Sequence, residues 1–196
     1  MPLLEKSGVA LSVLRGGGPD AAASLEQLID TPANADGAVW TPSTRDAQKA
    51  PRFGTCSIQR YQRPAGWKAL DVARAYFRWL PSDVPLVRTQ ELEGVFTIFT
   101  AGVRTLVLRL VPGRSSDDVA WFEIADGALR SATQRDGHAR FEFRNLLDGQ
   151  HTLAVLIDFE PSLPFLFYRF TQAAMHERVM RHFGQWLAAQ TGAPPS

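Results

Sequence analysis

The chain has 196 residues, 45% of them hydrophobic and 21% charged, which is the composition of an ordinary globular domain. Its 21 basic and 20 acidic residues are interleaved and leave a formal charge of +1, so no basic stripe indicates nucleic-acid binding. The single cysteine, Cys56, excludes an internal disulfide and gives no metal-ligand spacing. We expect no signal peptide and no membrane-spanning segment, which would need ~20 apolar residues, and therefore a cytoplasmic location.

The first 54 residues are predicted to form an N-terminal segment that differs from the rest of the chain. Residues 9–15 favour a strand that runs into a glycine triplet, and residues 20–30 favour a short helix with Asp20 placed to cap it. Residues 31–51 are rich in turn formers and predict irregular structure. The glycine triplet lacks the Lys-Ser/Thr ending of a phosphate-binding loop.

The next segments predict a strand at residues 55–63 and a helix at residues 66–81 that stops at Pro81. Most of this helix is apolar, so we expect Phe77 and its neighbours to be buried in a core rather than to form a cofactor site. Its charged residues lie three and four positions apart and form one narrow polar stripe, Lys68, Asp71, Arg74 and Arg78.

From residue 86 the hydrophobic period becomes two, which is typical of β-strands. Asp-Gly pairs end three of the segments, and they predict hairpin loops of two to five residues with Gly127, Gly137 and Gly149 at positive φ. The sequence therefore predicts an antiparallel meander. Its seven expected strand segments are 87–94, 95–102, 104–113, 118–127, 128–137, 138–149 and 151–161.

Alternation assigns the side chains of the last two segments to two faces. We expect the charged residues Arg140, Glu142 and Arg144 on one face. The apolar residues are expected together on the other face, namely Phe141, Phe143, Leu153, Val155, Ile157 and Phe159.

Residues 162–190 predict a C-terminal helix of up to ~40 Å, capped by Ser162. Its second half should bury one apolar side, Val179, Phe183 and Trp186, because the other side is charged.

Extending that buried side backwards along a straight helix gives two expectations for its first half. Phe165, Tyr168, Gln172 and His176 should face the sheet, beside a pocket. Leu163, Phe167 and Phe170 should face outward, where the N-terminal segment or a second subunit in a homodimer would cover them. The alternative is a helix kinked near Thr171, with its phenylalanines packed inward.

This order of elements resembles the START/SRPBCC helix-grip superfamily, which includes the polyketide cyclase, coenzyme-Q-binding and pollen-allergen families. The resemblance covers residues 55–190 and rests on the element order, the Asp-Gly hairpins and the ending FYRFTQAAMHERVMRHFGQWL. An uncharacterised branch has a helix ending in Trp, a Gly-Thr-Leu run and a Glu-Glu-Arg-Phe strand. Trp79, residues 127–129 and residues 138–141 occupy comparable places here, without the paired glutamates.

The resemblance implies an α+β fold in which a curved antiparallel sheet wraps a long C-terminal helix and leaves a cavity between them. Residues 55–190 would form this domain, residues 1–54 the N-terminal strand, helix and irregular segment, and residues 191–196 a disordered tail. The superfamily has no universal catalytic set, so no functional residue is carried over.

Catalytic and metal-binding motifs are absent from the sequence. No serine stands in a Gly-x-Ser-x-Gly elbow and no His-x-x-x-His pair is present, so we expect neither a metal nor a cofactor. The remaining acid/base candidates are Tyr168, His176 and Asp158.

The leading functional hypothesis is a domain that holds an apolar or aromatic small molecule between sheet and terminal helix. The alternatives are a cyclase or dehydratase-type enzyme on the same scaffold, and a partner-binding or multimerising protein whose cavity is not used. The expected ligand-binding residues are Phe165, Tyr168, Gln172, His176, Phe141, Phe143 and Ile157.

Overall fold

The computed structural model describes residues 11–15, 55–132, 139–160, 162, 173–192 and 194. This part of the chain forms an eight-stranded antiparallel sheet and two α-helices, which confirms the α+β class. The elements are β1 Leu11–Arg15, β2 Thr55–Gln62, α2 Ala69–Asp83, β3 Val87–Leu92, β4 Val95–Thr100, β5 Val103–Leu110, the 3₁₀ turn η1 Pro112–Arg114, β6 Val119–Asp126, β7 Arg140–Asn145, β8 His151–Phe159 and α4 Ala173–Ala188.

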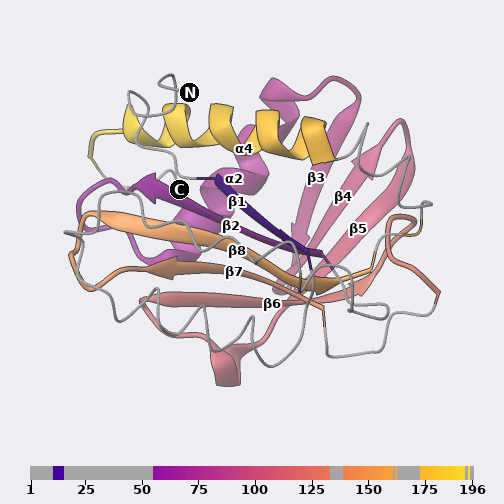
Figure 1. The fold of residues 1–196 in the computed structure, drawn as a ribbon, viewed down its shortest axis with the longest axis horizontal. Helices are drawn as coiled ribbons and strands as arrows, with labels where there is room; N and C mark the ends of the chain where they lie inside the picture. Colours follow the sequence, from indigo (N-terminus) through magenta and orange to yellow (C-terminus); the bar gives the residue numbers. More distant parts are fainter. Residues whose placement is uncertain are drawn as a thin grey trace.

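The strands follow the order β1-β2-β8-β7-β6-β5-β4-β3, so β3 to β8 form the predicted meander and β2 returns beside β8. Both helices lie on one face of this sheet, which we call the helix-covered face (Figure 1). Helix α2 packs on β3, β6 and β7, whereas α4 packs on β2 and against α2. The N-terminal segment also contributes to the sheet, because β1 pairs with β2.

The structure has the expected antiparallel sheet with a C-terminal helix packed on it, but the sheet does not wrap around a long helix. The described helix α4 has 16 residues and measures about 24 Å at 1.5 Å per residue, against the expected ~40 Å. The sheet does not curl strongly around α4, because α2 occupies much of the same face (Figure 1). Residues 163–172, where we predicted the first half of the helix, lie outside the described residues.

The buried side of α4 is as predicted. Val179 and Phe183 are buried, Trp186 is half-buried, and Arg178 and Arg181 on the other side are exposed. Phe183 makes an edge contact with Tyr76 of α2, and their ring centroids are 5.1 Å apart. The two helices therefore share one aromatic core with the sheet.

Helix α2 begins three residues later than predicted, at Ala69, and the backbone N–H of Lys68 donates to Asp71 Oδ2 at 2.8 Å. Phe77 is buried, as predicted, and stacks on Phe96 of β4 with ring centroids 4.6 Å apart. The expected polar stripe is exposed at Lys68 and half-buried at Arg74, which forms an ion pair of 2.8 Å with Glu91.

Pro81 does not stop α2, which continues to Asp83. A proline inside a helix leaves the carbonyl four residues earlier without its N–H donor. Here that carbonyl belongs to Phe77, and the hydroxyl of Thr89 on β3 donates to it at 2.7 Å. The substitute donor comes from a strand that the sequence does not place beside Phe77, which explains why the predicted helix end was wrong.

Replacing Thr89 by valine should destabilise the protein by about 1–2 kcal/mol, because it leaves the Phe77 carbonyl without this donor. Urea unfolding of the variant measures this cost. Thr97→Val, at a half-buried position of β4, is the matched control, and we expect a change below about 0.5 kcal/mol. Equal effects of the two substitutions would contradict the role given to Thr89.

The tight hairpin turns lie where the sequence has Glu93-Gly94 and Ala101-Gly102. All four residues have positive φ, between 50° and 83°, as type I′ turns require. Of the predicted Asp-Gly turns, Gly149 fits, with φ of 69° in the short loop between β7 and β8.

Gly127 has positive φ, at 126°, but it does not belong to a short hairpin. The connection from β6 to β7 runs from Gly127 to Ala139, and its described residues include no strand at the predicted segment 128–137. The third predicted turn glycine, Gly137, lies outside the described residues.

The face assignment of β8 was wrong for Leu153, Val155 and Ile157. These residues pair with Arg144, Glu142 and Arg140 and so share the face opposite the helices. Register explains the difference, since the pairing of Phe141 with Leu156 and of Phe143 with Ala154 puts those residues on the helix-covered face.

Phe159 returns to the helix-covered face because β8 has an irregularity just before it. The pairing with β2 shifts register between Thr55 and Ser57, opposite the part of β8 that includes Asp158. Asp158 has a φ of 54°, which lies in the left-handed region. A bulge of this kind breaks the alternation of period two, and sequence alternation alone does not locate it.

The loop between β7 and β8 is organised by Asp148. Burial acts to raise the pKa of its carboxyl, but the backbone N–H groups of Gln150 and His151 and the His151 side chain together hold that pKa below its usual value of 3.8. Asp148 also forms an ion pair of 3.1 Å with Arg60 of β2.

A lowered folded-state pKa means that the stabilising effect of Asp148 is present above the unfolded pKa and is lost as the pH falls through the folded one. Asp148→Asn should therefore cost about 1 kcal/mol at neutral pH and little at about pH 2. Denaturant unfolding of the protein and the variant at both pH values measures this difference. The same cost at both would show that the carboxylate charge is not what stabilises the loop.

Candidate functional site: a cavity between the helices and the sheet

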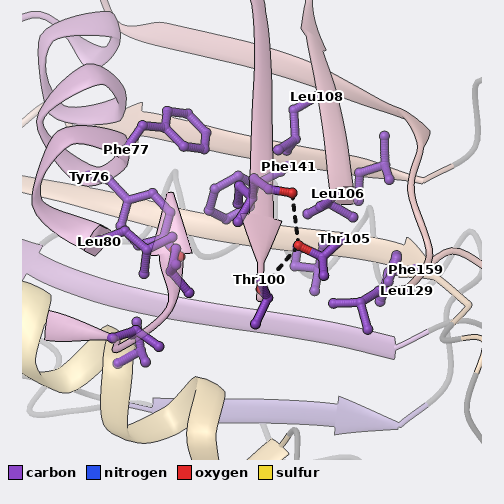
Figure 2. A pocket seen from close by; sticks show the side chains of 16 residues that line it. Tyr76, Phe77, Leu80, Thr100, Thr105, Leu106, Leu108, Leu129, Phe141 and Phe159 are labelled. Carbon is purple, nitrogen blue, oxygen red and sulfur yellow. Dashed lines mark hydrogen bonds between the residues drawn. The ribbon is translucent and has the colours of Figure 1, made fainter. Parts of the chain in front are cut away.

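A cavity of about 200 Å³ lies between α2, α4 and the helix-covered face of the sheet (Figure 2). The described residues enclose it only in part. Its lining comes from both helices, from β3 to β8 and from the segment that follows β6. The lining residues are Tyr76, Phe77, Leu80, Val84, Val87, Ile98, Thr100, Thr105, Leu106, Leu108, Ile124, Leu129, Phe141, Leu156, Phe159 and Val179.

The described lining residues are apolar except for Tyr76, Thr100 and Thr105, and none of them carries a charge. Figure 2 shows Tyr76 on the α2 side of the cavity and the two threonines across from it, on β4 and β5. An apolar cavity with a few polar groups is the usual composition of a small-molecule site.

Tyr76 is held by aromatic rings of the core, including Phe141 at 5.9 Å and Phe143 at 5.7 Å between centroids. Its side chain is only 7% exposed, and its hydroxyl has no hydrogen-bond partner among the described residues. Burial raises the pKa of Tyr76 far above its usual value, so the phenol stays neutral.

Tyr61 of β2 is the contrasting case. It is fully buried, and its hydroxyl donates to Gln59 Oε1 at 3.2 Å. Gln59 in turn donates to the hydroxyl of Ser57 at 2.8 Å. The three side chains form a hydrogen-bonded row along β2, whereas no such row includes Tyr76 among the described residues.

The two tyrosines should respond differently to the loss of the hydroxyl group. Tyr61→Phe should destabilise the protein by about 1 kcal/mol, because it removes a buried hydrogen bond. Tyr76→Phe should change stability by less than about 0.5 kcal/mol, because no protein hydrogen bond is lost. Urea unfolding of both variants is the test, and an equal loss in Tyr76→Phe would mean that its hydroxyl has a protein partner.

Thr100 reaches the cavity by the regular alternation of β4, whereas Thr105 reaches it through an irregularity between β4 and β5. Ile98 pairs with Leu106 and Phe99 with Arg104, so Thr105 is an extra residue in the ladder. The hydroxyl of Thr105 donates to the carbonyl of Ile98 at 2.8 Å, and its oxygen lies 3.3 Å from Thr100 Oγ1.

A close backbone contact places the segment after β6 against the cavity. The N–H groups of Ala128 and Leu129 donate to the carbonyls of Arg104 and Thr105, both at 3.0 Å. A Cβ atom at Gly127 would overlap the backbone of Thr105. Glycine at this position therefore lets the segment lie along β5 and brings Leu129 into the lining.

The sequence-predicted ligand residues fall in different places. Phe141 lines the cavity. Phe143 is buried in the aromatic core outside the lining, and Ile157 lies on the opposite face of the sheet. The others are outside the described side chains, namely Phe165, Tyr168, Gln172 and His176.

The proposed acid/base and dimer residues are placed as follows. Asp158 is half-buried at the β8 bulge and is not among the lining residues. Tyr168 and the side chain of His176 are outside the described part, so their catalytic roles stay predictions. The same holds for the homodimer contact through Leu163, Phe167 and Phe170.

Most of the lining was not predicted from the sequence, including Tyr76, Thr100, Thr105 and Leu129. The prediction that Tyr76 lies in the core is correct for its ring. That prediction did not consider its hydroxyl group. One signal was available, since Tyr76 and Trp79 are the two side chains with a polar group among the buried residues of α2.

Two histidines with described side chains have carboxylate partners. His151 Nδ1 lies 2.7 Å from Asp148, and His182 Nδ1 lies 3.0 Å from Asp83 at the end of α2. Among the described residues, no group of three or more His, Cys, Asp or Glu could hold a metal ion. None of the described helices is both long and apolar enough to cross a membrane.

Comparisons with known proteins give no match for this chain. No protein-family model matches the sequence, and neither a curated protein nor a solved structure is significantly similar to it. The cavity is therefore the feature that bears on function.

Proposed function

We propose that this protein is a binding domain that holds an apolar or aromatic small molecule in the cavity between α2, α4 and the sheet. The observation that carries the proposal is an apolar cavity of about 200 Å³ next to a densely packed aromatic core. Native interiors leave few voids larger than a water molecule, so an apolar cavity of this size is a place for a ligand.

The volume indicates a ligand about the size of one substituted ring. An engineered apolar cavity of about 150 Å³ in another protein binds benzene. The present cavity is somewhat larger, at about 200 Å³, and it is only partly enclosed by the described residues.

The topology also supports the proposal. The first strand of the domain, β2, lies beside the last strand, β8, and the meander then runs back to β3. Together with a helix after β2 and a helix at the end of the chain, this is the element order that the resemblance to helix-grip domains implies. In those domains the cavity lies between the sheet and the terminal helix, and here Val179 of α4 is part of the lining.

Binding of toluene, measured by calorimetry and by the shift in melting temperature, tests the proposal. A ligand that binds only the folded state raises the free energy of unfolding. At ligand concentrations well above Kd, this increase grows with the logarithm of the ligand concentration. We expect saturable binding and a rising melting temperature.

A variant that fills the cavity connects binding to this site. Leu129→Trp should abolish toluene binding, because Leu129 lines the cavity. Leu147→Trp is the matched control, since Leu147 is 91% exposed and does not line the cavity. Binding that survives Leu129→Trp, or no binding by the unmodified protein, would contradict the proposed function.

A further inference from the structure

The proton of each threonine hydroxyl in the cavity can be assigned. A hydroxyl has one proton to donate, and a backbone carbonyl can only accept. Thr105 therefore uses its proton on the carbonyl of Ile98, and the contact of 3.3 Å with Thr100 Oγ1 requires Thr100 to be the donor. Both protons are used within the protein, so this pair offers only oxygen lone pairs to a ligand.

Tyr76 offers the complementary group. Its hydroxyl proton has no acceptor among the described residues, and its ring is buried among other rings. The Tyr76 hydroxyl is not among the fully buried polar atoms that lack a partner, so it is accessible, and a ligand atom that accepts from it gains a hydrogen bond.

The described lining disfavours a charged ligand group. Among the described residues that line the cavity, none carries a charge that could pair with a carboxylate or an ammonium group. Moving an unpaired charge into an apolar cavity is far more costly than moving a neutral polar group.

From these three observations, and resting on the binding function proposed above, we infer that the ligand is a neutral alcohol or phenol on a ring-sized apolar body. A hydroxyl is the smallest neutral group that both donates and accepts. Its proton is recognised by Thr100 and Thr105, and a ligand oxygen accepts from Tyr76.

Three probes of similar size test the inference, each by calorimetric titration of the full-length protein. p-Cresol can donate and accept, its isomer anisole can only accept, and toluene can do neither. An apolar cavity without polar partners would disfavour p-cresol, because its hydroxyl would lose its hydrogen bonds with water. We expect p-cresol to bind at least as tightly as toluene and benzoate not to bind.

Two conservative variants test which protein groups form hydrogen bonds with the ligand. Thr100→Val should weaken p-cresol about tenfold, the effect of one lost hydrogen bond to a ligand, and leave anisole and toluene unchanged. Tyr76→Phe should weaken p-cresol and anisole by a similar factor and leave toluene unchanged. Thr97→Val on β4, which is outside the lining, is the control and should change none of the three affinities.

The outcomes separate this inference from the proposed function. Toluene binding with no p-cresol binding, or with p-cresol affinities unchanged in Thr100→Val and Tyr76→Phe, would overturn the hydroxyl assignment and leave the binding function standing. Benzoate binding more tightly than p-cresol would overturn the assignment of a neutral ligand. If none of the probes binds the unmodified protein, both the inference and the proposed function are wrong.

Discussion

Replacing Gly127 by alanine is expected to destabilise the protein by about 3 kcal/mol or more. Two costs add at this position. The backbone has a φ of 126°, which an L-residue adopts only with strain, and the new Cβ would overlap the backbone of Thr105 and Leu106 in β5. A clash with strand backbone cannot be relieved by a rotamer change, so β5 or the segment after β6 has to move.

The control for this prediction is Gly149→Ala in the loop between β7 and β8. Gly149 also has a positive φ, at 69°, but a Cβ atom there would meet nothing within 4 Å. We expect a loss of about 1 kcal/mol from backbone strain alone. Urea denaturation of both variants measures the difference, and a loss at Gly127 no larger than at Gly149 would contradict the close contact with β5.

Truncating Phe183 to alanine should be the most damaging change in α4, at about 3–5 kcal/mol. The side chain is fully buried, and its ring lies between the sheet and both helices. Its centroid is 5.6 Å from Tyr61 of β2, 5.3 Å from Trp79 of α2 and 5.9 Å from Trp186 of α4. Removing the ring leaves a cavity that rigid neighbours cannot fill.

Chemical denaturation of Phe183→Ala tests how strongly the packing of α4 in the core stabilises the protein. Leu147→Ala, at a residue that is 91% exposed, is the control and should change the free energy of unfolding by less than about 0.5 kcal/mol. A loss below about 1 kcal/mol for Phe183→Ala would mean that α4 does not form part of the common core.

The strands and α2 could be predicted because their signals are local. Alternation over residues 86–126 predicts β3 to β6, and the single polar stripe of α2 correctly predicts that Phe77 is buried. The buried side of α4 follows from the charges at Arg178 and Arg181 by the same reasoning.

The features that were wrongly predicted depend on contacts between segments distant in the sequence. Pro81 is tolerated because Thr89 donates to the Phe77 carbonyl. Ile157 turns away from the helices because of its register with Arg140. No local pattern contains either contact, so periodicity alone cannot locate them.

The cavity was harder still to predict, because its lining depends on such irregularities. Thr105 reaches it through an extra residue in β5, and Leu129 through the close approach of Gly127 to that strand. Phe141 lies in the lining because it follows the regular alternation of β7, and its role in ligand binding stays a prediction.

The central claim is that a small apolar molecule occupies the cavity on the helix-covered face. A toluene titration followed by methyl chemical shifts in ¹H–¹³C NMR spectra tests it most directly. We predict saturable shifts at Leu106, Ile124 and Leu129, which line the cavity, and none at Val155 and Ile157 on the opposite face. Equal shifts at both sets of methyl groups, or shifts only on the opposite face, would contradict the account.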